Sequence, residues 1–149
     1  IMYFKYMDFP TIPDELLGQD LNYFVGRKNI FRIPSYTHYK QYEIDTKLKE
    51  FLSEIFKFDF HCSYQVITNG LDIHKDGSRT ECLNYLIDTG GENSELRIYN
   101  DDKLEILHSE RILNKKWHWI NVGMNHNVVN ISNTRISISI DPYKTTFKS

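Results

Sequence analysis

The stretch HNVVNISNTRISISI, residues 126–140, alternates polar and apolar residues after Ser132-Asn133 and mixes them before it. In a β-strand successive side chains point to opposite faces, and a two-residue loop fixes which residues of a hairpin lie opposite one another. If Ser132 and Asn133 form such a loop, one face of the hairpin carries His126, Val128, Asn130, Arg135, Ser137 and Ser139. The other face then carries Val129, Ile131, Ile136, Ile138 and Ile140.

These two faces predict different surroundings. The apolar face requires a cover, and residues 39–56 can supply it, because their apolar side chains recur at helical spacing after Pro34-Ser35. We expect this segment to be the main helix. The polar face is costly to bury inside a small barrel unless it holds a ligand or water, so it predicts an interior binding cavity.

The remaining pattern predicts strands. Before the main helix we expect a strand at Tyr3–Phe9, a helix from Pro13 to Gly26 and a short strand at Asn29–Ile33. After Lys57 we expect eight strands: His61–Thr68, Leu71–Asp76, Glu81–Asp88, Glu95–Tyr99, Leu104–Leu107, Lys116–Ile120, His126–Ile131 and Thr134–Ile140. This predicts an α+β, mainly β fold with a double-stranded β-helix, or jelly-roll, core.

Length and composition limit the possible functions. The 149 residues predict a single domain, with residues 1–57 as an N-terminal strand and helix region and 58–142 as the core. A net charge of −2 without runs of like charge gives no sign of nucleic-acid or membrane binding. Two cysteines are too few for a disulfide framework, and no signal peptide is visible, so we expect a soluble, cytoplasmic protein.

The segment Leu71-Asp-Ile-His-Lys-Asp76 predicts a metal site. On an extended strand His74 and Asp76 point the same way and can bind one ion. His126 can add a third ligand from another strand. Two imidazoles and one carboxylate suit Fe(II) and leave coordination positions open for chemistry. His118, between two tryptophans, is the competing third ligand.

The order of several motifs resembles the 2-oxoglutarate- and Fe(II)-dependent dioxygenases, most closely their prolyl 4-hydroxylase-like branch. The resemblance extends from Tyr64 to Ile140 and rests on His74-x-Asp76, Gly90-Gly91, Leu96-Arg-Ile-Tyr99, His126-x-Val128 and Arg135. It implies that iron is bound by His74, Asp76 and His126, and that Arg135 binds the distal carboxylate of 2-oxoglutarate. We prefer His126 to His118 because only His126 has the arginine nine residues later.

Three further residues acquire roles from this resemblance, and a fourth, Arg79, from its position just after the His74-x-Asp76 motif. Ser137 could donate a hydroxyl to the same carboxylate, or could be only a small inward-facing residue. Tyr85 matches a family tyrosine that hydrogen-bonds the same carboxylate, and Tyr64 matches a second cavity tyrosine, although aromatic residues on buried strands often belong to the core. Arg79 could contact substrate at the cavity mouth, or could be a solvated turn residue.

The resemblance implies a hydroxylase that uses 2-oxoglutarate and O2 as co-substrates and releases succinate and CO2. A peptide or protein substrate, prolyl-like, is the first expectation, a small molecule the second, and a nucleobase the last because no basic patch exists. A different class of function stays open: a non-catalytic jelly-roll binding or particle-associated module that retains a metal site.

Overall fold

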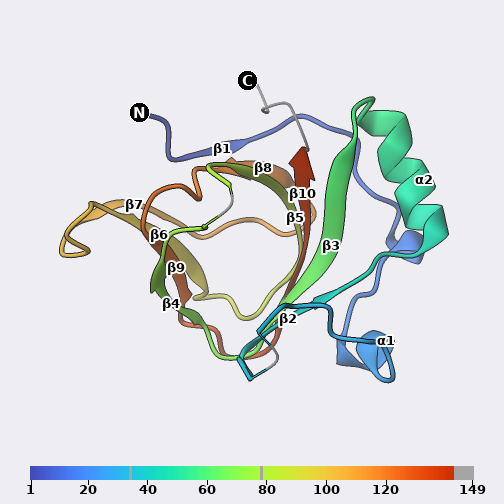
Figure 1. Cartoon of the computed structure of the whole chain (residues 1–149), viewed down its shortest axis with the longest axis horizontal. Helices are drawn as coiled ribbons and strands as arrows, with labels where there is room; N and C mark the ends of the chain where they lie inside the picture. Colours follow the sequence, from blue (N-terminus) through green and yellow to red (C-terminus); the bar gives the residue numbers. More distant parts are fainter. Residues whose placement is uncertain (34, 78, 143–149) are drawn as a thin grey trace.

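The computed structural model describes residues 1–33, 35–77 and 79–142, which form two facing antiparallel sheets (Figure 1). The major sheet has the strand order β1 (Phe4–Tyr6), β8 (Trp117–Ile120), β5 (Cys82–Thr89), β10 (Arg135–Pro142), β3 (Phe60–Ile67) and β2 (Tyr39–Tyr42). The minor sheet has the order β4 (Leu71–His74), β9 (His126–Val129), β6 (Glu95–Tyr99) and β7 (Ile106–Glu110).

From β3 onward the chain crosses repeatedly between the sheets. β3, β5, β8 and β10 lie in the major sheet, whereas β4, β6, β7 and β9 lie in the minor sheet. This alternation is the strand order of a jelly roll, so the expected mainly β, double-stranded β-helix fold is confirmed. All eight strands expected after Lys57 are present, with some ends shifted by a few residues.

The main helix is α2 (Thr46–Ile55), which lies on the outer side of β3 in Figure 1. Leu48 and Leu52 join one buried cluster with the β10 isoleucines Ile136, Ile138 and Ile140, all at most 1% exposed. Burying each such aliphatic side chain contributes about 1.5–3 kcal/mol relative to leaving it in water. The apolar face of β10 therefore receives the helix, as the sequence predicts.

The N-terminal region differs from the expectation. In place of a helix from Pro13 to Gly26, the chain forms a 3-10 turn, η1 (Asp14–Leu16), and a single helical turn, α1 (Leu21–Phe24). Asn29–Ile33 is not a strand. Residues 39–42, expected within the main helix, form β2 instead, because their backbone pairs with the edge of β3. That pairing is non-local, and helical periodicity alone could not reveal it.

The predicted hairpin of residues 126–140 is wrong. β9 pairs with β4 and β6 in the minor sheet, whereas β10 pairs with β3 and β5 in the major sheet. The segment between them crosses from one sheet to the other, and the N–H groups of Ser132 and Asn133 donate to the carbonyl of Gly90, each at 2.8 Å. Alternation fixes the face of each side chain but not the partner strand, which tertiary packing selects.

The face assignments on β10 are correct, but those after β9 are not. Ile131 packs against a second buried cluster rather than under α2, and Asn130 is exposed. This second cluster contains Cys82, Leu86, Ile120, Leu96, Ile98 and Val128, drawn from both sheets. The buried polar residues include Gln65, Asn84, His118, His126, Arg135, Ser137 and Ser139.

Within the described ranges, no helix combines the length and the apolar character that crossing a membrane requires.

Candidate metal centre

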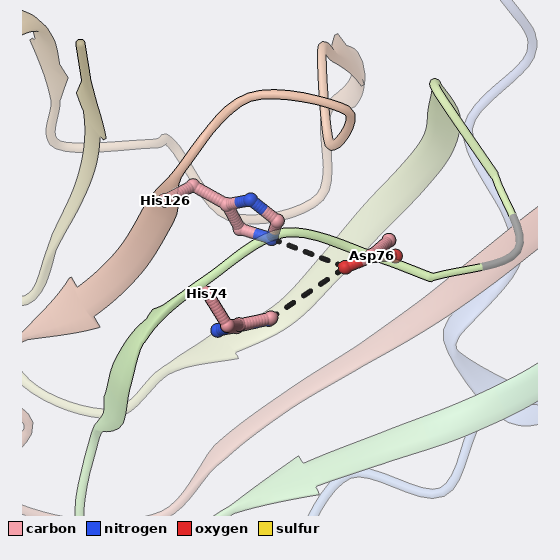
Figure 2. A group of neighbouring side chains, drawn as sticks. All are labelled: His74, Asp76 and His126. Carbon is pink, nitrogen blue, oxygen red and sulfur yellow. Dashed lines mark ion pairs between the residues drawn. The ribbon is translucent and has the colours of Figure 1, made fainter. Parts of the chain in front are cut away.

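Three elements bring His74, Asp76 and His126 together (Figure 2). The β4–β9 pairing places His74 directly opposite His126. β4 ends at His74, so Asp76 lies in the following loop rather than on the expected strand, and its N–H donates to the carbonyl of Val122 at 3.1 Å. Asp76 Oδ1 lies 3.6 Å from His74 Nε2 and 3.4 Å from His126 Nε2. One ligand atom from each residue thus falls within 4.8 Å of the others.

Both imidazoles are oriented by backbone carbonyls. His74 Nδ1 lies 2.7 Å from the carbonyl oxygen of Asp72, and His126 Nδ1 lies 2.7 Å from that of Met124. A carbonyl oxygen can only accept, so Nδ1 carries the hydrogen in each ring and donates it. Nε2 of each ring is then the nitrogen directed at Asp76, and it is the ring atom that would bind a metal.

The charge state of Asp76 also suits a cation. Burial opposes its ionisation, but the hydrogen bond with His126 and the positive charge of Arg79 outweigh burial and lower the pKa of Asp76 to about 2. The side chains of His126 and Asp76 are 8% and 16% exposed, whereas that of His74 is 40% exposed. The carboxylate is therefore ionised, His126 and Asp76 are largely buried, and the cluster is open to solvent at His74.

Arg135 lies on the inner face of the major sheet and is 5% exposed. Its Nη1 donates to the carbonyl of Thr89 and to Ser94 Oγ, each at 3.0 Å. In the described part of the chain no carboxylate lies within ion-pair distance of it. Burial lowers the pKa of Arg135 to about 10, so it remains charged at neutral pH. Among the described residues it is thus a buried cation with no carboxylate in ion-pair contact, although the more distant charge of Asp88 also acts on it.

Ser137 shares this inner face, as expected, and its hydroxyl donates to Gln65 Oε1 at 3.4 Å. Gly90 makes room for Arg135: it has a φ of +82°, and a Cβ there would lie 2.9 Å from that of Arg135. A glycine is therefore needed at this position for both conformation and space.

The two tyrosines expected in the cavity lie on the wrong face. Tyr64 and Tyr85 both pair with Ile138, and both belong to the buried cluster under α2. The Tyr64 hydroxyl accepts from the Gly18 N–H at 2.8 Å. Their prediction as co-substrate ligands is therefore wrong, because residues that face each other across strands share one side of the sheet.

Sequence reasoning missed Tyr39. It pairs with Ile67, which also pairs with Arg135, so Tyr39 belongs to the inner side of the major sheet. Its hydroxyl accepts from Gln41 Nε2 at 2.8 Å. The alternation of residues 39–42 was the available signal, but these residues also fit a helical period.

Arg79 and His118 have other positions than the sequence suggested. Arg79 is not a solvated turn residue, because it pairs with Asp76 and Asp141; its side chain is 23% exposed, and its contact with substrate stays a prediction. His118 is 2% exposed and stacks on Phe4 with ring centroids 5.5 Å apart, and it is not part of the triad. Burial, assisted by the positive charge of Arg135, lowers the pKa of His118 to about 3.

A cavity of about 580 Å³ lies beside β4 and β9. It is lined by Tyr36, His38, residues 69–73 and residues 127–131, and so includes the neighbours of His74 and His126 but neither histidine. Asn127 is 7% exposed there, and its Oδ1 accepts from the Tyr99 hydroxyl at 3.0 Å. The two strands thus border both the triad and a separate polar hollow.

No family description matches this sequence, and no curated protein is similar enough in sequence to be matched. Among solved structures, the chain is similar to a prolyl-4-hydroxylase from Pseudomonas putida, at 13% identity and a TM-score of 0.58, over 93% of this chain and 91% of that one. It is also similar to a single-residue mutant of Bacillus subtilis oxalate decarboxylase, at 14% identity and a TM-score of 0.50, over 83% of this chain. It spans only 30% of the oxalate decarboxylase chain. These similarities show a mainly β, cupin-like jelly-roll fold.

Proposed function

We propose that this protein is an Fe(II)- and 2-oxoglutarate-dependent dioxygenase that hydroxylates a C–H bond and releases succinate and CO2. The observation that carries the proposal is a combination: a two-histidine, one-carboxylate cluster lies in the same jelly roll as a buried arginine that makes no ion pair with a carboxylate among the described residues. A group of metal-binding side chains alone is compatible with many functions. A buried cation that can pair with a carboxylate favours a reaction with an acidic co-substrate.

His74, Asp76 and His126 would hold the iron through two Nε2 atoms and Asp76 Oδ1. The residues fit this role, since both rings present Nε2 and the carboxylate is ionised. When bound, the metal supplies open coordination positions at which a co-substrate and O2 can meet. The protein contributes the fixed donors and the dry surroundings on the His126 side.

Arg135 would bind the distal carboxylate of 2-oxoglutarate. A buried cation is expensive unless an anion pairs with it, and a guanidinium offers a planar fork of donors that matches a carboxylate. Its Nη1 is used by Thr89 and Ser94, whereas no acceptor among the described residues contacts Nε or Nη2. Ser137, two residues further on the same face, would add a hydroxyl donor.

The substrate in this proposal is a peptidyl, prolyl-like side chain or a small molecule. The His74 side chain is 40% exposed, so a substrate can approach the candidate metal ligands from that side. The net charge of −2 gives no support to a nucleic-acid substrate. Cytoplasmic localisation remains a prediction from the sequence.

The test is co-substrate turnover. Protein purified without oxygen and loaded with Fe(II) should convert 2-oxoglutarate to succinate when O2 is admitted, and His126→Ala should not. Metal binding without succinate formation, with or without a panel of proline-containing peptides, would instead favour the non-catalytic binding module.

A further inference from the structure

Asp76 divides its two carboxylate oxygens between different partners. Oδ1 faces Nε2 of both histidines, at 3.4 and 3.6 Å. Oδ2 accepts from Nε of Arg79, three residues later in the same loop. A carboxylate has two equivalent oxygens, so only an outside partner can decide which one is directed at the metal cluster.

Arg79 is itself fixed from the other sheet. Its Nη1 donates to Asp141 Oδ1 and, at 3.0 Å, to Ser139 Oγ, both on the last strand β10. The Arg79 side chain is 23% exposed and that of Asp141 is 32% exposed. One guanidinium therefore connects the loop after β4, in the minor sheet, to β10 in the major sheet.

The charges in this network leave the candidate metal site with a net negative charge. Arg79 stands between two carboxylates, so the group of three retains a net negative charge, which favours a divalent cation. Without Asp141, the positive charge of Arg79 would be directed at Asp76 alone and would compete with the metal. Asp141 is thus the counter-charge that lets an arginine contact a metal-binding carboxylate.

Asp76 also needs an external support. It lies beyond the end of β4 and is followed by Gly77, so the strand ladder does not restrain its side chain. Its backbone N–H bond to Val122 fixes the main chain but leaves the side-chain torsions free.

We propose that Arg79 is a positioning residue for the metal-binding carboxylate, and that Asp141 and Ser139 hold Arg79 in place. The proposal rests on the proposed metal site and adds a specific prediction to it: Asp76 binds the ion through Oδ1 alone, while Oδ2 stays on Arg79. Outer partners of metal ligands typically change metal affinity by about 10- to 100-fold when they are removed.

The experiment measures metal affinity in the whole protein, with Co(II) as the anaerobic probe and its visible spectrum as the second readout. Arg79→Gln should weaken Co(II) binding by about 10- to 100-fold and alter the spectrum, because the carboxylate can then rotate. Arg79→Lys should recover part of the affinity, since its ammonium can still donate to Oδ2 but lacks the fork. Asp141→Asn should also weaken binding, although it leaves the direct partners of Oδ1 and Oδ2 unchanged.

Arg97→Gln is the matched control. Arg97 pairs with Glu95 on β6 at 2.6 Å and contacts no triad residue. The Arg97→Gln variant should bind Co(II) with the same affinity as the wild type. If Arg79→Gln does not fold, as judged by its thermal unfolding midpoint, Asp141→Asn and Arg79→Lys decide the question.

Wild-type affinity and spectrum in both the Arg79 variants and Asp141→Asn would overturn the positioning role and leave the proposed function standing. A wild-type protein that binds neither Co(II) nor Fe(II) would overturn the proposed function, and the positioning role with it.

Discussion

Replacing Arg135 with leucine tests the co-substrate site directly. Arg135 is 5% exposed, so a carboxylate that pairs with it is almost fully removed from water. Truncating one partner of such a buried charge pair costs about 2–5 kcal/mol in binding. Because about 1.4 kcal/mol corresponds to a tenfold change, the dissociation constant of 2-oxoglutarate should rise by roughly 30-fold to several thousand-fold.

The same substitution should affect stability much less. Leucine removes the hydrogen bonds to Thr89 and Ser94, each worth about 1.5–3 kcal/mol for a charged donor. It also removes a buried cation that has no carboxylate partner among the described residues, which relieves a cost of several kcal/mol. These effects oppose each other in the ligand-free protein, so its free energy of unfolding should change less than the binding energy does.

The assay is an anaerobic titration of the Fe(II) protein with 2-oxoglutarate, followed by the metal-to-ligand absorption band. Arg135→Lys should be intermediate, because it keeps the charge but loses the bidentate fork. Arg97→Leu, on the minor sheet, is the control and should leave the affinity unchanged. If Arg135→Leu binds 2-oxoglutarate as tightly as the wild type, the diacid is not held by Arg135 and the proposed co-substrate site is wrong.

Three further outcomes are expected. Removing any one metal ligand, by alanine at His74, Asp76 or His126, should abolish tight Fe(II) binding in equilibrium dialysis, whereas His118→Ala should retain it; the reverse pattern would exchange the two histidines. His118 has a folded-state pKa depressed to about 3, so its neutral form stabilises the fold fully above about pH 6.5 and that stability is lost as the pH falls toward 3. Between pH 7.5 and 5.5 urea unfolding should show a loss of about 1.4 kcal/mol that is absent in His118→Gln, and equal losses in both proteins would contradict this account. Tyr64→Phe should cost about 1 kcal/mol of stability through the lost Gly18 hydrogen bond, with 2-oxoglutarate affinity unchanged; a weakened affinity would return Tyr64 to the cavity.

The sequence by itself determined the two faces of β10 and the residue types of the candidate site. The alternation of Ile136, Ile138 and Ile140 identified the side of β10 that α2 covers, because side-chain direction in a strand depends only on local backbone geometry. The same alternation placed Arg135 and Ser137 inside. The three candidate metal ligands followed from residue type and order, which do not depend on knowing which strands pair.

Tertiary structure decided which strands pair and which side chains contact one another. Ser132-Asn133 reads as a hairpin turn, yet β9 and β10 enter different sheets, because each completes its backbone hydrogen bonds with strands distant in sequence. Tyr64 and Tyr85 were assigned to the cavity from their resemblance to family positions, but their pairing with Ile138 places both under α2.

Two further features could emerge only from the folded chain. Tyr39 fits both helical and strand periods, and its pairing with the edge of β3 selects the strand, which places Tyr39 on the same side of the major sheet as Arg135. Arg79 looked like a turn residue because its partner Asp141 is sixty-two positions away. Local sequence encodes which way a side chain points, whereas the contacts that fix a buried charge come from segments that only the completed sandwich brings together.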